Sequence, residues 1–217
     1  MRILVTGGAG FIGSHLVERL LADGHTVVIL DDFNDYYDPK IKRANIAAVS
    51  KDVRVHDVDL RDAQKVASVF RNEKFDAIFH LAARAGVRPS IQQPQLYYDT
   101  NVAGTLHLLE GARTSGVERF IFASSSSVYG AAKTVPFSEE EHLTQTLSPY
   151  AATKIAGEFL CSTYSHLYKM RTVALRYFTV YGGRQRPDLA IHQFTRKINA
   201  GEPIDQFGDG TTRRDYT

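Results

Sequence analysis

The feature that most constrains the fold is a glycine-rich turn close to the start of the chain. The segment GGAGFIG places Gly7, Gly10 and Gly13 directly after a short apolar run and at the start of an amphipathic stretch. In such a strand–turn–helix unit, the first glycine permits the tight turn and the second lets a pyrophosphate approach the backbone. The third lets helix and strand pack closely, and the helix N-terminus offers free N–H groups to the phosphates. The motif predicts a dinucleotide-binding unit.

An acidic residue about 20 positions downstream supports the same interpretation. Asp31 ends the next apolar run, where a carboxylate can accept hydrogen bonds from both ribose hydroxyls of an adenosine. Because a carboxylate there repels a 2′-phosphate, we expect NAD rather than NADP as the cofactor. Arg43 follows in a helical stretch rather than at the strand tip, and Asp32 is the alternative acidic contact.

Short apolar runs alternate with longer amphipathic stretches along most of the chain. The predicted strands are residues 3–5, 27–30, 53–56, 77–80, 120–123 and 172–176. The predicted helices are residues 11–23, 41–48, 63–70, 102–115 and 150–168. This alternation predicts right-handed βαβ crossovers and a doubly wound parallel sheet covered on both faces, a Rossmann-type α/β fold.

The alternation stops at Gly182. A loop is expected over residues 184–188, a helix over 189–200 and a turn over 207–210, and the chain ends at Thr217 without a closing element. We therefore expect an NAD-binding domain at residues 1–181, followed at 182–217 by the start of a truncated substrate-binding region.

A second chemical signal is the pair Tyr150 and Lys154, which follows Ser148-Pro149 at the start of an amphipathic stretch. The four-residue spacing puts both side chains on one face of a helix, one turn apart. A nearby ammonium favours the phenolate, and a bound nicotinamide cation adds to the effect. A tyrosine with a reference pKa of ~10 can thereby act as a base near neutral pH.

Four serines, Ser124, Ser125, Ser126 and Ser127, follow the predicted strand at 120–123. Ligands of doubly wound sheets bind at the carboxyl ends of the strands. A hydroxyl at this point can therefore hydrogen-bond a substrate oxygen and share its proton with the tyrosine. Some of the four serines must instead form a turn or cap the next segment.

Together these residues resemble the extended short-chain dehydrogenase/reductase family along the whole chain. The resemblance rests on GGAGFIG, DVDL, HLAA, TNVAGT, SSSSVYG and YAATK. It implies a catalytic set of Ser125, Tyr150 and Lys154, in which Lys154 also holds the nicotinamide ribose. The further cofactor positions that it implies are Phe11, Ile12, Asp59, Leu60, Leu81, Ala82, Ala83, Asn101, Ser124 and Tyr177.

The residues before Val128-Tyr129-Gly130 distinguish reactions within this family. Sugar-nucleotide 4,6-dehydratases carry an acidic pair there, which performs the elimination of water, whereas this chain has Ser126 and Ser127. The resemblance therefore favours a 4-epimerase, which oxidises C4 of a UDP-sugar and returns the hydride to the opposite face. In this hypothesis Tyr150 takes the 4-hydroxyl proton, NAD accepts the hydride and Ser125 orients the oxygen.

The segments ARAGVRPS, RYFTVYG and GGRQRPDLAIHQF resemble UDP-glucuronate 4-epimerases. Thr179 stands where UDP-galactose 4-epimerases usually have asparagine. The resemblance implies Arg186 as the partner of the uronate carboxylate, because a guanidinium binds a carboxylate in a bidentate manner. Arg88 is a weaker candidate, and Arg214 matches a position that contacts the nucleotide diphosphate. Gly183 replaces a proline that is usual in the family, which favours a looser loop around Arg186.

Three alternatives remain at this point. The chain could epimerise UDP-glucose and UDP-galactose, serve as a non-catalytic NAD-binding module, or bind NAD without activity because of the truncation. For the loop at 184–188, the alternative is a solvated basic segment. The family also implies a homodimer, formed through the helices predicted at 102–115 and 150–168.

The composition excludes several partners and sites. A formal net charge of +2 in 217 residues is too small to indicate nucleic acid or a membrane surface. Cys161 is the single cysteine, so no intrachain disulfide can form and a cytoplasmic protein is expected. The histidines lack the spacing of metal ligands, and we expect no metal site.

Overall fold

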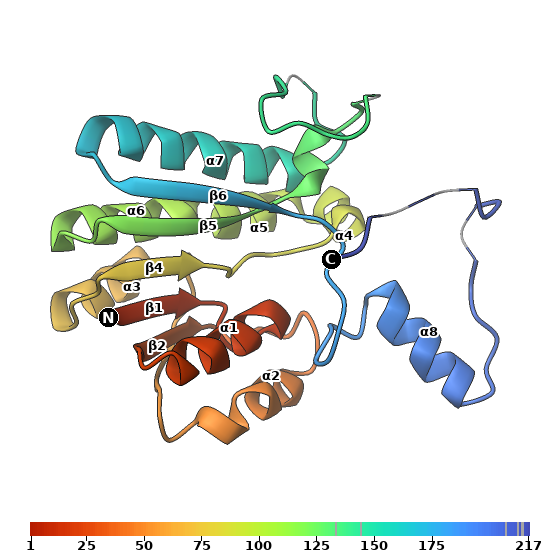
Figure 1. Cartoon of the computed structure of the whole chain (residues 1–217), viewed down its shortest axis with the longest axis horizontal. Helices are drawn as coiled ribbons and strands as arrows, with labels where there is room; N and C mark the ends of the chain where they lie inside the picture. The colour runs from red at the N-terminus through yellow and green to blue at the C-terminus, as the bar shows by residue number, and fades with distance from the viewer. Residues whose placement is uncertain (133, 144, 207, 212, 214) are drawn as a thin grey trace.

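Six parallel strands form one sheet in the order β3-β2-β1-β4-β5-β6 (Figure 1). The computed structural model describes residues 1–132, 134–143, 145–206, 208–211, 213 and 215–217. The strands are β1 (Arg2–Thr6), β2 (Thr26–Asp31), β3 (Arg54–Asp57), β4 (Ala77–His80), β5 (Arg119–Ser125) and β6 (Arg171–Tyr177). This strand order is that of a Rossmann fold, which confirms the predicted fold class.

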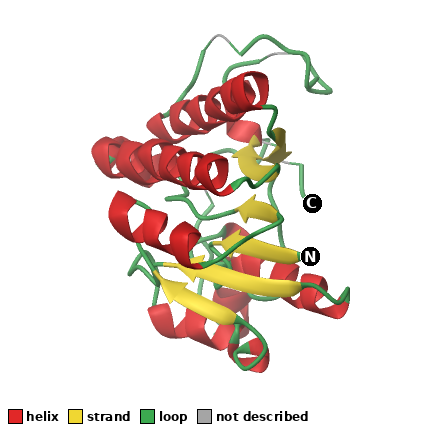
Figure 2. Cartoon of the chain, turned by 90° about the vertical axis from the view of Figure 1, so that its left-hand side faces the viewer, coloured by secondary structure: helices red, strands yellow, loops and turns green. Residues whose placement is uncertain are grey.

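Helices cover both faces of the sheet (Figure 2). They are α1 (Phe11–Ala22), α2 (Pro39–Asn45), α3 (Ala63–Asn72), α4 (Val87–Gln92), α5 (Pro94–Tyr98), α6 (Gly104–Ser115), α7 (Pro149–Tyr168) and α8 (Ala190–Asn199). One core packs α3, α6 and α7 against residues such as Leu4, Ile78 and Phe120. The other packs α1 against Val5 and Ile29 on the opposite face. Because both faces are covered at the centre of the sheet, β1, β2 and β4 read as nearly continuous apolar runs.

Two short helices, α4 and α5, were not predicted from the sequence. Each is too short to show a helical period, and Pro94 starts the second one. A π-helical turn at Asp99–Ala103 then leads into α6, so the predicted helix at 102–115 begins within that turn. The predicted helix at 41–48 begins earlier, at Pro39, because the Asp38 carboxylate caps its first turn.

The connections from β1 and β4, which are neighbours in the sheet, run in opposite directions along it. A sheet of this kind has a crevice at that switch point, outside the carboxyl ends of the strands. After β6 the chain leaves the sheet, and α8 lies away from it in Figure 1. Among the described residues no helix is long and apolar enough to cross a membrane.

Candidate active site

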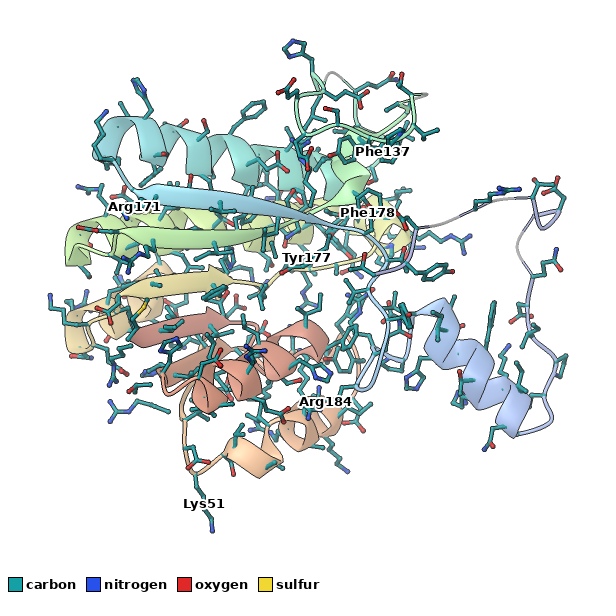
Figure 3. All side chains as sticks on the ribbon, viewed as in Figure 1. Lys51, Phe137, Arg171, Tyr177, Phe178 and Arg184 are labelled. Atoms are coloured by element: carbon teal, nitrogen blue, oxygen red, sulfur yellow. The ribbon has the colours of Figure 1, made fainter. Side chains whose placement is uncertain are left out.

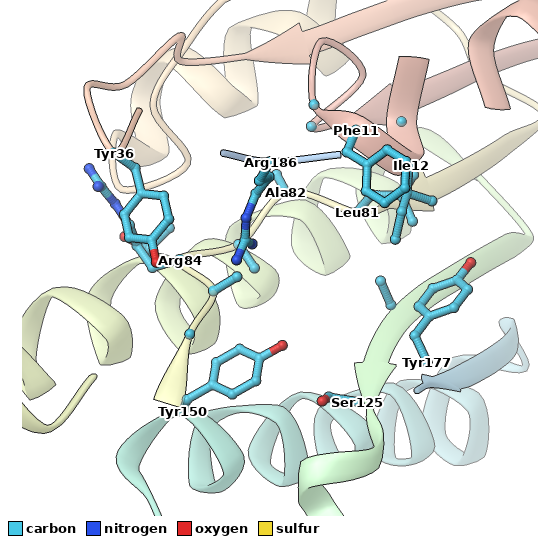
Figure 4. A pocket seen from close by; sticks show the side chains of 18 of the residues that line it. Phe11, Ile12, Tyr36, Leu81, Ala82, Arg84, Ser125, Tyr150, Tyr177 and Arg186 are labelled. Carbon is cyan, nitrogen blue, oxygen red and sulfur yellow. The ribbon is translucent and has the colours of Figure 1, made fainter. Parts of the chain in front are cut away.

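A cavity of about 450 Å³ opens at the switch point, at the carboxyl ends of β1, β2, β4, β5 and β6. Its size lies in the range of small-molecule and cofactor sites. Figure 4 shows Tyr150 and Ser125 on one side of the cavity and Arg186 reaching in from another. Residues from both ends of the chain therefore meet at the position where this fold binds ligands.

The glycine turn forms one wall of the cavity. Gly7 has a φ of +68°, and a Cβ there would lie 2.7 Å from the backbone nitrogen of Ala82. A Cβ on Gly13 would lie 2.1 Å from the carbonyl oxygen of Gly7. Gly10 precedes α1 without a side-chain cap, so the first N–H groups of the helix remain available to an anion. The turn thus has the close packing and the free donors of a phosphate cradle.

Tyr150 and Ser125 come together from α7 and the end of β5. The Ser148 hydroxyl accepts the Ala151 N–H at 3.1 Å and caps α7, which fixes the helix start that carries Tyr150. The Ser125 hydroxyl oxygen accepts hydrogen bonds from the Ser127 N–H at 3.2 Å and from the Ser127 hydroxyl at 2.9 Å. The serine is therefore held by its own turn while it faces the phenol.

Burial raises the pKa of the Tyr150 phenol and outweighs two effects that lower it. The lowering effects are a hydrogen bond with Ser125 and the positive charge of Arg186. The chain alone therefore favours the protonated phenol at neutral pH. Deprotonation of Tyr150 requires further positive charge beside it, such as that of a bound cation.

Lys154 follows Tyr150 by one turn of α7, and its side chain turns toward the end of β5. Its ammonium donates a hydrogen bond of 2.7 Å to the Ala123 carbonyl and lies 5.9 Å from the centroid of the Tyr150 ring. Burial lowers the pKa of Lys154 to about 8. The cation that lowers the pKa of Tyr150 is Arg186, because the Lys154 side chain turns toward the β5 backbone.

The sequence model of the NAD dependent epimerase/dehydratase family matches residues 3–217. The chain belongs to this family. Protein CapI of Staphylococcus aureus is 43% identical over all of this chain and 65% of its own length. The UDP-glucuronate 4-epimerase of Thermodesulfobacterium geofontis is 44% identical over 99% of this chain and 67% of its own length. The chain thus spans about two thirds of the length of these curated relatives.

Two solved structures of the epimerase/dehydratase family have the same fold over the whole of this chain. The UDP-glucuronic acid 4-epimerase from Bacillus cereus, in complex with UDP-glucuronic acid and NAD, has a TM-score of 0.92 and 39% identity, and 69% of it is covered. The UDP-glucose 4-epimerase of Thermus thermophilus, in complex with NAD, has a TM-score of 0.89 and 40% identity, and 70% of it is covered.

In this family member, Asp31 at the end of β2 lines the cavity and is hydrogen-bonded to the glycine turn. Its carboxylate accepts the Ala9 N–H at 3.1 Å and the Phe33 N–H at 3.0 Å. Burial raises the pKa of Asp31, although the nearby ammonium of Lys42 opposes the shift. Asp32 also lines the cavity.

Lys42 is a cavity residue that the sequence analysis missed. Its ammonium lies 4.0 Å from the Asp31 carboxylate and 5.2 Å from the centroid of the Tyr37 ring. Arg43, the cation considered from the sequence, lies instead against Phe33 and 3.7 Å from the Asp57 carboxylate. The signal that could have placed Lys42 was Asp38, which caps α2 and fixes its start at Pro39, so that Lys42 falls on the side of the helix that faces the cavity.

Two predicted cofactor residues use their side chains elsewhere. The Ser124 hydroxyl, although Ser124 borders the cavity, donates a hydrogen bond to Glu158. The Asn101 amide binds the backbone of Arg84 at 2.8 and 3.0 Å and the Thr153 hydroxyl at 3.0 Å. Asn101 therefore ties a cavity-lining segment to α7, one turn from Tyr150.

Asp59 is not one of the described residues that line the cavity. Its carboxylate binds the Arg61 guanidinium at 2.9 and 3.0 Å. The other predicted cofactor positions line the cavity, namely Phe11, Ile12, Leu60, Leu81, Ala82, Ala83 and Tyr177. The described residues contain no group of three or more His, Cys, Asp or Glu residues that could hold a metal ion.

Some of the predicted substrate residues line the cavity and others do not. Those that line the cavity are Ser125, Ser126, Ser127, Thr179 and Arg186. Arg88 lies in α4, outside the described wall of the cavity. Arg214 lies outside the described residues.

Arg186 already has a partner in the cavity. Its Nε and Nη2 atoms each donate to the Asp188 carboxylate at 2.9 Å. Its guanidinium also lies over the Tyr36 ring, 5.4 Å from the ring centroid. Because a guanidinium has five N–H donors, the Nη1 edge of Arg186 is left for a second acceptor. The loop at 184–188 is therefore not the solvated basic segment of the alternative interpretation.

Proposed function

We propose that this cavity binds NAD. The tight glycine turn and the uncapped start of α1 suit a pyrophosphate. The Asp31 carboxylate and the Lys42 ammonium offer an acceptor and a donor to the adenosine ribose, and Lys154 can reach the nicotinamide ribose. When bound, the nicotinamide would supply reversible acceptance of a hydride and the positive charge that Tyr150 lacks for deprotonation.

We propose that the reaction is 4-epimerisation of a UDP-sugar. The single observation that carries the proposal is the placement of the Tyr150 phenol and the Ser125 hydroxyl together on one side of the cavity (Figure 4). The Tyr150 oxygen removes the proton of the 4-hydroxyl as a hydride leaves C4, and it returns the proton when the hydride comes back to the opposite face of C4, so the net redox change is zero. The Ser125 hydroxyl holds the same sugar oxygen, and the Arg186 guanidinium stabilises negative charge on the phenolate.

Ser126 and Ser127 favour epimerisation over dehydration. Elimination of water needs an acid and a base beside the sugar. A serine hydroxyl does not ionise near neutral pH and cannot replace a carboxylic acid in that step. The dTDP-glucose 4,6-dehydratase DesIV from Streptomyces venezuelae has the same fold, with a TM-score of 0.90 and 35% identity, so the fold itself does not decide between the reactions.

For the substrate we propose UDP-glucuronate, with UDP-galacturonate as the product. The Arg186 guanidinium can bind the uronate carboxylate through its free edge. The hydroxyls of Ser126, Ser127 and Thr179 line the same cavity and add neutral donors. The alternative is UDP-glucose and UDP-galactose, which is supported by the similarity to the Thermus thermophilus UDP-glucose 4-epimerase.

Arg186→Met separates the two substrates. In the NAD-loaded protein, we expect the variant to bind UDP-glucuronate at least about tenfold more weakly, because it loses charge-assisted hydrogen bonds worth ~1.5–3 kcal/mol. Binding of UDP-glucose should change by less than about threefold. Isothermal titration calorimetry measures both affinities, and Arg19→Met on the exposed side of α1 is the matched control. Equal weakening of both sugars would contradict the assignment of Arg186 to the uronate.

We also propose that the protein is a homodimer. Apolar side chains are exposed on neighbouring helices, with Leu106 on α6 and Phe159 and Leu167 on α7. Adjacent exposed apolar helix faces are typical of subunit interfaces. Light scattering should give twice the chain mass, and Phe159→Glu should give a monomer. A monomeric mass for the wild-type protein at micromolar concentration would contradict the proposal.

A further inference from the structure

The loop that carries Arg186 is fastened to the cofactor-side helix α1. The Glu18 carboxylate pairs with the Arg184 guanidinium at 2.6 Å. The His15 Nε2 atom lies 2.9 Å from the Gly183 carbonyl oxygen and donates to it, because a carbonyl only accepts. Figure 3 shows the loop reaching from the end of β6 to the side of α1, where Arg184 lies. These four residues, Glu18, His15, Gly183 and Arg184, are called the α1 clamp below.

The clamp residues of α1 share one face of the helix with a cavity residue. Phe11, His15 and Glu18 follow at spacings of four and three residues, which places them in one row along the helix. The Phe11 and His15 rings also contact edge to face at 5.9 Å. Phe11 lines the cavity, whereas Val17 and Leu20 face the core. One face of α1 therefore supports the ligand cavity and the substrate loop together.

The loop begins with two glycines that have open space around them. Gly182 has a φ of +140°, and neither Gly182 nor Gly183 would bring an added Cβ within 4 Å of another atom. Two unpacked glycines allow many backbone conformations. Arg184 has a φ of +62°, which an ordinary side chain adopts only when its surroundings hold it there.

The guanidinium of Arg184 is paired with the carboxylate of Glu18. The Nη1 atom of Arg184 is buried without a hydrogen-bond partner among the described residues, so the Glu18 carboxylate is the counter-charge that the structure shows for it. Beyond Arg184, the buried Gln185 donates to the Val180 carbonyl at 3.0 Å and accepts the His192 N–H at 3.1 Å. Gln185 is thus held between Arg184 and Arg186, so the position of Arg184 also affects the position of Arg186.

We propose that Glu18 and His15 are positioning residues for Arg186, and so determine the preference for an anionic sugar. Neither is among the described residues that line the cavity, and they act by holding the loop from α1. The identity of the sugar rests on the proposed function, whereas the clamp itself rests on the observed contacts alone. A displacement of a substrate-holding group by about 1 Å is enough to cost a large factor in binding or rate.

Glu18→Gln tests the clamp by two independent measurements on the NAD-loaded protein. Hydrogen exchange of the Gln185 and Leu189 amides, both hydrogen-bonded within the loop, should accelerate about tenfold, in line with loss of a charge-assisted hydrogen bond. The dissociation constant for UDP-glucuronate should rise about tenfold, while those for UDP-glucose and NAD stay within about twofold. Arg19→Ala, next to Glu18 on the exposed side of α1, is the control and should change none of these.

The charge-reversed pair Glu18→Arg with Arg184→Glu should restore slow exchange and uronate affinity to within about threefold of wild type, which a general folding defect would not allow. Unchanged exchange in Glu18→Gln, or the same acceleration in Arg19→Ala, would overturn the clamp. Accelerated exchange with unchanged sugar affinities would overturn its role in positioning Arg186. If the wild-type protein binds neither sugar, the proposed function fails, and hydrogen exchange alone still decides the clamp.

Discussion

Tyr150→Phe is expected to lower the rate of C4 inversion by about a thousandfold or more, while NAD affinity stays close to wild type. The phenol is the proposed proton acceptor, and loss of a positioned acid–base group typically costs about 10²–10⁴-fold. The ring remains, so its edge-to-face contact with Tyr97, at 6.3 Å between centroids, is kept. The variant therefore removes the reacting oxygen and little else.

The matched control is Tyr98→Phe, which removes a hydroxyl from an exposed tyrosine of α5. It should leave the rate within about twofold of wild type, as expected for a surface substitution. Rates are compared at saturating NAD and UDP-sugar, so that only the chemical step is tested. If Tyr150→Phe kept more than about a tenth of the wild-type rate, another group would have to move the proton.

Gly13→Ala is expected to abolish NAD binding, with an affinity loss of at least about 100-fold. The added methyl would overlap the Gly7 carbonyl oxygen at 2.1 Å, so β1 and α1 would have to move apart. Overpacking of this kind typically destabilises a protein by about 1–3 kcal/mol. The movement also displaces the N–H groups that we assign to the pyrophosphate. Titration calorimetry with NAD and a thermal unfolding curve measure the two effects.

Gly183→Ala is the control, because Gly183 does not have a left-handed φ and has open space around the added methyl. It should change neither NAD affinity nor thermal stability measurably. Wild-type NAD affinity in Gly13→Ala would show that the turn does not hold the pyrophosphate. An equal loss in both variants would show that the effect comes from glycine replacement in general.

Features that depend on short stretches of sequence were predictable. The apolar runs predicted all six strands, and the signal was strongest for β1, β2 and β4, which are buried on both faces. The glycine turn was recognisable because its three glycines follow a strand and open a helix. Tyr150 and Lys154 could be placed on one face of α7 from their spacing alone.

Features that depend on contacts between distant segments were not predictable. Glu18 and Arg184 are 166 positions apart, and no local pattern relates them. The sequence also did not predict that the hydroxyl of Ser124 would bond Glu158, or that the amide of Asn101 would bond Thr153, because these partners lie 34 and 52 positions away. The orientation of Lys154 also depends on a long-range contact, since the β5 carbonyl that it binds is 31 positions away.

The central claim is tested most directly by proton NMR of the purified chain with NAD and UDP-glucuronate, with UDP-glucose in a parallel sample. The anomeric region distinguishes each sugar from its C4 epimer. We predict that UDP-galacturonate appears from the uronate and that UDP-glucose is converted much more slowly or remains unchanged. If neither sugar changes in a sample that holds stoichiometric NAD, the chain binds the cofactor without the proposed epimerase activity.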